Sequence, residues 1–245
     1  MKKIISLLIC VLLLVSCGNK HEGEEKPSLL SNLINITDNE NNGIEEILNF
    51  YGGRCEYSIG VSASTSDGTK KYFEIEMSQS DEIEKRLDKP ILPSSNIAYI
   101  FYKNLKEEKK NYDAIHVILV SKNNAEQEFK YPISTLEKVE QRMSLNDKTV
   151  NLLKEKKFEN LKTMLNNELI PFDKNELVPR LIKLEPQFGD IKEYRFFGFM
   201  IAPYKGKDIL HLSGALLREK QNHEFSIDVD FNSNRDELYQ LQYKK

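Results

Sequence analysis

The sequence predicts an α+β protein of two small domains, the C-terminal one an α+β roll with a curved antiparallel sheet over helices. Some segments carry apolar residues at helical spacing, and others alternate apolar with polar residues as strands do. In the last third of the chain the expected strands follow the expected helices, an order typical of α+β folds. The length of 245 residues suffices for two domains of roughly 100 residues after a short leader.

Residues 1–16 have the pattern of a secretory signal peptide. Lys2 and Lys3 precede an apolar run from Ile4 to Val15, which is shorter than the roughly 20 residues needed to cross a bilayer. The run ends in Leu14-Val15-Ser16-Cys17, which resembles the lipobox of bacterial lipoproteins. The resemblance implies cleavage before Cys17 and acyl chains such as palmitate on its thiol. The expected partner is therefore a lipid bilayer, held through acylated Cys17.

The resemblance also bears on localisation in the cell envelope. Gly18, not aspartate, follows the cysteine, and in lipoproteins of many Gram-negative bacteria this permits transfer to the outer membrane, on its periplasmic or surface side. Residues 17–42 combine the lipidated cysteine with a polar segment that we expect to be a flexible tether.

Residues 43–143 are expected to form an N-terminal α/β unit, which resembles no family that we recognise. Its predicted order is helix, hairpin, helix, hairpin, helix. The supporting segments are a helix that ends at Gly52-Gly53, a hairpin across Ser66-Asp67-Gly68, a helix over 95–109, a buried strand over 115–120, a strand with Phe129 and Tyr131, and a helix opened by the capping box Ser134–Glu137.

Residues 146–245 are expected to form the roll. We predict a helix from Val150 to Leu165, a helix start at Asp173, and strands over 194–202, 208–218, 223–231 and 237–243. Three segments precede a strand meander: Lys156-Lys157-Phe158-Glu159-Asn160-Leu161, Phe188-Gly189 and Ile191-Lys192-Glu193-Tyr194. Together with the meander they resemble the nuclear transport factor 2-like, or cystatin-like, superfamily. The resemblance implies a cone whose mouth holds a ligand, an active site or a partner.

Composition and spacing argue against several function classes. Lys and Arg are spread along a chain of net charge -3, so we expect no nucleic-acid partner. No two histidines have zinc-ligand spacing, so we expect neither a metal site nor a cofactor. Cys55 is the single cysteine of the folded part, which excludes an internal disulfide, and we expect it to serve as a small hydrophobic residue on the inward face of a strand.

The candidates for a pocket are His211, Asp228, Tyr194 and Phe197. His211 and Asp228 lie on neighbouring predicted strands and could face each other there. The direction of His211 stays open, because apolar residues occupy both faces of its strand. Tyr194 and Phe197 could line a pocket or pack in the core, and core packing is the favoured role.

The favoured function is a membrane-anchored, non-enzymatic binding or accessory module for an envelope protein partner or a small ligand. One alternative is an envelope enzyme with its active site around His211 in the mouth of the roll. A second alternative is a structural or assembly subunit, which would expose a broad apolar patch. A deep pocket with His211 within hydrogen-bond reach of a carboxylate would favour the enzyme, whereas a filled cone would favour the other two classes.

Overall fold

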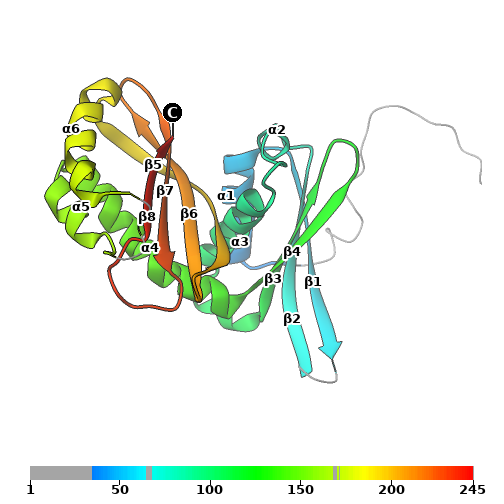
Figure 1. The fold of residues 1–245 in the computed structure, drawn as a ribbon. Helices are drawn as coiled ribbons and strands as arrows, with labels where there is room; N and C mark the ends of the chain where they lie inside the picture. The colour runs from blue at the N-terminus through cyan, green and yellow to red at the C-terminus, as the bar shows by residue number, and fades with distance from the viewer. Residues whose placement is uncertain (1–34, 65–67, 168–169, 171, 245) are drawn as a thin grey trace, which may run out of the picture.

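The chain folds into two four-stranded sheets with helices packed on them (Figure 1). This computed structural model describes residues 35–64, 68–167, 170 and 172–244. The predicted α+β class in two parts is confirmed, and the sheet order is β1-β2-β3-β4 in one sheet and β5-β6-β7-β8 in the other. The predicted signal peptide, the predicted lipobox and Cys17 lie outside the described residues. No helix in the described ranges is sufficiently long and apolar to span a bilayer.

The first sheet contains a crossover that makes its two central strands parallel. β1 pairs antiparallel with β2 and β3 pairs antiparallel with β4, whereas β2 and β3 run parallel because α3 lies between them in the chain. The elements of this part are α1 (Asp38–Tyr51), β1 (Arg54–Ser64), β2 (Gly68–Ser78), α2 (Asp81–Glu84), α3 (Ile91–Leu105), the 3₁₀ helix η3 (Lys106–Asn111), β3 (Ala114–Val120) and β4 (Glu126–Pro132).

Helix α1 begins earlier than the sequence predicts. Residues 38–42, which the sequence places in the tether, form its first turn. Thr37 and Glu40 make a reciprocal capping box that satisfies backbone N–H groups at the helix start. The Glu40 carboxylate also accepts a hydrogen bond from the buried Tyr112 hydroxyl. Of the predicted tether, residues 38–42 therefore belong to a capped helix.

Helix α3 is buried on almost all sides because it packs against both sheets. Its Phe101 ring lies 4.2 Å from Phe73 of β2, while its Tyr99 ring lies 5.7 Å from Phe196 of β5. Ser95 Oγ accepts a 2.7 Å hydrogen bond from the backbone N–H of Phe199, which ties the helix to β5. The sequence predicts a single apolar side for this helix, but its buried serines are satisfied by such bonds instead of facing water.

Helix α4 crosses the predicted boundary between the two units. It runs unbroken over Ile133–Lys154, where the sequence predicts one helix ending near 143 and another starting near 150. Buried polar residues interrupt the apolar pattern: Asn146 and Thr149 are 0% exposed. The predicted capping box at Ser134 is wrong, because Pro132 precedes the helix and no side-chain cap forms. The buried core is continuous across both parts.

The second part is a meander of four antiparallel strands with helices on one face, as the sequence predicts. The sequence predicts one helix of about five turns from Val150 to Leu165. The structure instead has the end of α4 and a separate short helix there. The elements are α5 (Phe158–Met164), the 3₁₀ helix η4 (Lys174–Glu176), α6 (Leu177–Phe188), β5 (Ile191–Tyr204), β6 (Lys207–Arg218), β7 (His223–Asp230) and β8 (Gln240–Lys244).

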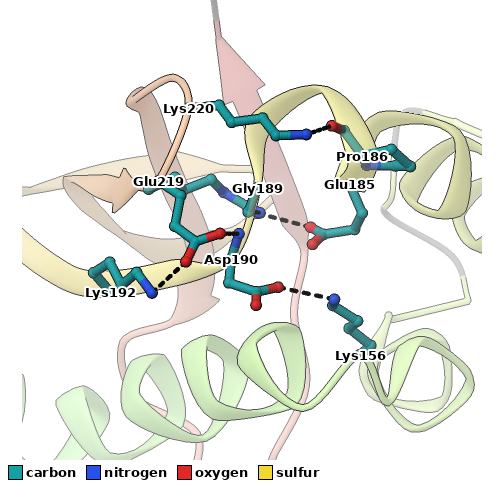
Figure 2. A network of polar contacts seen from close by, with 9 residues as sticks. Lys156, Glu185, Pro186, Gly189, Asp190, Lys192, Glu219 and Lys220 are labelled. Carbon is teal, nitrogen blue, oxygen red and sulfur yellow. Dashed lines mark hydrogen bonds and ion pairs between the residues drawn. The ribbon is translucent and has the colours of Figure 1, made fainter.

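The turn between α6 and β5 is fixed by a group of polar contacts (Figure 2). The Arg218 guanidinium, whose side chain is 0% exposed, also donates 2.8 Å hydrogen bonds to the Glu185 carboxylate and to the carbonyl oxygen of Gly189. Exposed contacts surround this buried pair: Lys156–Asp190, Lys192–Glu219 and Lys220 to the carbonyl oxygen of Pro186. The turn that starts β5 is thereby held against β6.

Candidate functional site

The candidate site lies on the face of the second sheet that the helices α4 to α6 do not cover. Strand β6 alternates strictly here: Leu210 and Leu212 are 0% exposed in the core, whereas His211 and Ser213 point to the opposite face. Strand pairing places Asp228 of β7 directly opposite His211. The direction of His211, which the sequence leaves open, is therefore outward, away from the filled interior of the roll.

His211 and Asp228 form a close pair. The His211 Nδ1 atom lies 2.6 Å from Asp228 Oδ1, and the two side chains are 26% and 19% exposed. An ionised carboxylate can only accept, so Nδ1 carries the hydrogen when the imidazole is in its neutral form. This tautomer leaves a lone pair on Nε2. The arrangement thus fixes the ring and provides a base or a hydrogen-bond acceptor at the sheet surface.

A cavity of about 630 Å³ opens beside this pair. Its floor comes from the second sheet and its wall from the segment between α2 and α3. This volume falls in the usual range for small-molecule sites. The residues that line it are Lys85, Arg86, Asp88, Lys89, Pro90, Ile91 and Leu92 from the wall, and Phe197, Met200, His211, Ser213, Glu224, Phe225, Ser226 and Gln242 from the sheet.

A β-bulge in β5 turns Phe197 toward the cavity. Phe196 pairs with Gly214 and Gly198 with Ser213, so Phe197 is the extra residue between them. The Arg86 guanidinium lies 4.1 Å over the Phe197 ring and joins the wall to the floor. Gly198 has φ +133° and its missing side chain lets α3 approach closely, because a Cβ there would lie 2.0 Å from the carbonyl oxygen of Leu92.

A smaller cavity of about 380 Å³ adjoins the first. Met200 and His211 line both cavities, and Asp228 and Tyr239 line the smaller one. The histidine therefore stands between two hollows on one sheet face. A ligand in either hollow would reach its ring.

Tyr194 is not part of this site. It lies on the core face of β5, where its ring meets Phe225 edge-on at 5.8 Å. Burial raises the pKa of the Tyr194 hydroxyl above its usual range. Of the four candidate residues, the structure brings His211, Asp228 and Phe197 together, whereas Tyr194 packs against the core and borders a separate cavity of about 680 Å³.

The chemistry available at the site is binding and proton transfer. Ser213 and Ser226 line the cavity with His211. In the part of the chain that the structure describes, however, no hydroxyl or thiol is hydrogen-bonded to the His211 ring. Cys55 is far from this role: it faces the core of the first sheet opposite Met77, and burial raises its pKa to about 12, as expected for a small hydrophobic residue.

The cavity wall and one further cluster were not predicted from the sequence. The wall residues Arg86, Lys89 and Leu92 carry no motif, and they reach the second sheet only because α3 packs on β5. The cluster lies on the first sheet and contains three potential metal ligands: Glu74 of β2, His116 of β3 and Glu128 of β4. Its members come from three strands and share no sequence spacing.

Comparison of the chain with protein-family models, with curated proteins and with solved structures finds no match.

Proposed function

We propose that this protein is a lipid-anchored lipoprotein of the cell envelope that binds a small amphipathic ligand on the outer face of its second sheet. The observation that carries the binding role is the cavity of about 630 Å³, which joins apolar residues such as Phe197 and Met200 to polar groups such as Ser213 and Gln242. Apolar walls with a few oriented polar groups are typical of small-molecule sites. The pattern of the strand meander supports a nuclear transport factor 2-like roll as the scaffold.

The alternative function of a structural or assembly subunit is less favoured. Among the described residues the large apolar side chains with high exposure are Val61, Ile182, Met200 and Tyr204, and they come from three separate elements. A subunit held in a permanent complex would be expected to present one broad patch instead. Met200 and Tyr204 do lie together, but both line the smaller cavity.

The anchor is tested by replacing cysteines one at a time in the full chain. Cys17→Ala is expected to release the protein into the soluble fraction and to abolish labelling by a palmitate analogue. Cys55→Ala is the matched control, because it removes a thiol on the core side of β1 and leaves the lipobox intact. Membrane attachment of the Cys17→Ala protein after a high-salt wash would contradict the proposal.

The ligand site is tested by mass spectrometry of the protein after incubation with an envelope extract. Wild type is expected to retain a small molecule that Phe197→Ala loses, since the substitution removes the aromatic floor beneath Arg86. Ile182→Ala serves as a control at an exposed position of α6 that lines neither cavity. Equal retention by all three proteins, or retention by none, would argue against a ligand in this cavity.

A second candidate function, an envelope enzyme, is favoured by the 2.6 Å contact between His211 and Asp228. A carboxylate that holds a neutral imidazole in one tautomer prepares Nε2 to take a proton from a bound substrate. In the same extract experiment, an enzyme would give a changed molecule with wild type and the unchanged molecule with His211→Gln. Recovery of one identical molecule from both proteins would support binding without turnover.

A further inference from the structure

The second sheet is not the only surface with unusual chemistry; the open face of the first sheet carries an acidic patch around a histidine. Phe73, Ile75, Ile115 and Val117 point into the core, so the residues that alternate with them face outward. The outward acidic side chains of this patch are Glu56, Glu74, Glu76, Glu126 and Glu128, against which stand Arg54 and Lys130.

The parallel pairing of β2 and β3 sets Glu74 directly beside His116. On the other side of β3, His116 pairs with Lys130, and Glu128 lies two residues before Lys130 on the same face of β4. One ligand atom of each of Glu74, His116 and Glu128 lies within 4.8 Å of the others. Three adjacent strands thus bring two carboxylates and an imidazole to a single point.

The His116 ring is held in place by an aromatic neighbour. The residue is 9% exposed, and its ring stacks on Tyr72 with centroids 4.0 Å apart and planes at 9°. Among the described residues, its closest polar contact is the 3.5 Å approach of Nδ1 to the Glu128 carboxylate. His116 therefore offers an imidazole nitrogen at the point where the two carboxylates meet.

The two carboxylates are arranged as ligands in different ways. Ser58 Oγ donates a 3.1 Å hydrogen bond to Glu74 Oε1, which orients the carboxylate and leaves its second oxygen available. Glu128 Oε1 is shared with the Lys130 ammonium at 3.1 Å, and both side chains are about half exposed or more. The ammonium can therefore swing into water when a cation of higher charge arrives.

We propose that Glu74, His116 and Glu128 bind one divalent transition-metal ion, with Zn²⁺ as the best fit to the donor set. One imidazole nitrogen and two carboxylate oxygens suit zinc, whereas calcium and magnesium are bound almost entirely by oxygen. Three protein ligands leave a fourth position for water or for a ligand of the metal.

The site is tested with the full chain in detergent, stripped of metal with a chelator and titrated with ZnCl₂ by calorimetry. Wild type is expected to bind one equivalent. His116→Gln and Glu74→Gln should each remove a ligand and weaken binding by at least tenfold, and Ser58→Ala, which only orients Glu74, should weaken it by roughly tenfold. Glu126→Gln is the matched control, because it removes a charge of the same sign from the same face of β4 without removing a ligand.

Lys130→Ala keeps the experiment informative if His116→Gln disturbs folding. The variant retains all three ligands and removes the ammonium that competes for Glu128, so it should bind Zn²⁺ more tightly than wild type. Failure of wild type to bind one saturable equivalent would overturn the proposal. So would a loss in Glu126→Gln equal to that in Glu74→Gln, because binding would then follow net charge instead of the three ligands. Neither result depends on the ligand cavity of the second sheet.

Discussion

Acidification is expected to destabilise this protein through one buried histidine, His223, at the start of β7. The residue is 4% exposed, and its ring lies 4.5 Å from that of Phe188 and 4.8 Å from that of Tyr243. Neither ring nitrogen has a hydrogen-bond partner in the described part of the chain. Burial first, and then the positive charge of Arg218, lower the pKa of His223 from 6.5 to about 4. The folded protein therefore holds this imidazole neutral.

The sign and size of the effect follow from this lowered pKa. Between pH 6.5 and pH 4 the unfolded chain binds a proton that the folded chain does not, so the free energy of unfolding falls as the pH is lowered. The stabilisation is fully present above pH 6.5. A pKa difference of about 2.5 at about 1.4 kcal/mol per pH unit gives a loss of up to about 3 kcal/mol when the pH reaches 4.

Urea unfolding of wild type and His223→Phe at several pH values isolates this contribution. Phenylalanine keeps a ring between Phe188 and Tyr243 but cannot titrate. On going from pH 7.5 to pH 5.5, the free energy of unfolding of wild type should fall by about 1.4 kcal/mol more than that of the variant. At pH 4.5 this extra loss should be about 2.6 kcal/mol. Parallel pH dependences for the two proteins would refute the reasoning, because His223 would then have the same pKa folded and unfolded.

Two further predictions concern the contact between β5 and α3 at Gly198 and the buried Arg218–Glu185 ion pair. Gly198→Ala should lower the free energy of unfolding, measured in urea, by at least about 3 kcal/mol. The added Cβ would collide with the backbone of α3, and the φ of residue 198 disfavours alanine. Gly206→Ala is the control: its φ is also positive but the space around it is open, so it should cost only about 1 kcal/mol. Glu185→Met should lower the melting temperature, at a cost of about 3 kcal/mol, because it leaves the Arg218 charge buried without its partner. The exposed control Glu219→Met should cost less than about 1 kcal/mol, and equal losses in the two variants would contradict the role of burial.

Local patterns predicted the second sheet well because its faces differ so clearly in polarity. In β7, Phe225, Ile227 and Val229 are at most 1% exposed, and they alternate with residues on the other face. Such a period-two pattern requires no knowledge of the rest of the chain. The strand order of the meander then follows from short connections.

Features that depend on distant contacts could not be predicted in the same way. The length of α4 was missed because Asn146 and Thr149 are polar yet fully buried, so the apolar period breaks where the helix continues. The bulge at Phe197 has no local signal, and it decides which aromatic side chains of β5 enter the core. The direction of His211 was open for a related reason: apolar residues such as Ile209 share its face.

Of the candidate site, the sequence predicted only the pairing of His211 with Asp228 on two neighbouring strands. His211 and Asp228 meet across an antiparallel register that the alternation of β6 and β7 fixes. The wall of the cavity and the cluster around His116 require, respectively, the packing of α3 on β5 and a parallel pairing across a crossover. Neither arrangement leaves a spacing in the sequence.

We expect that the second sheet neither folds nor binds a ligand without the first part of the chain, because α3 and α4 pack against both sheets. Leu136 and Val139 of α4 are 0% exposed, and a fragment of residues 146–245 would begin within the same helix, after both of them. The fragment would also lack α3, whose contact with Phe199 supports the bulge and whose leading segment forms the cavity wall. We expect this fragment to give no cooperative unfolding transition by circular dichroism, whereas residues 35–245 should give a single transition. A fragment of 146–245 that unfolds cooperatively would show instead that the roll is an independent domain and that α3 merely rests on it.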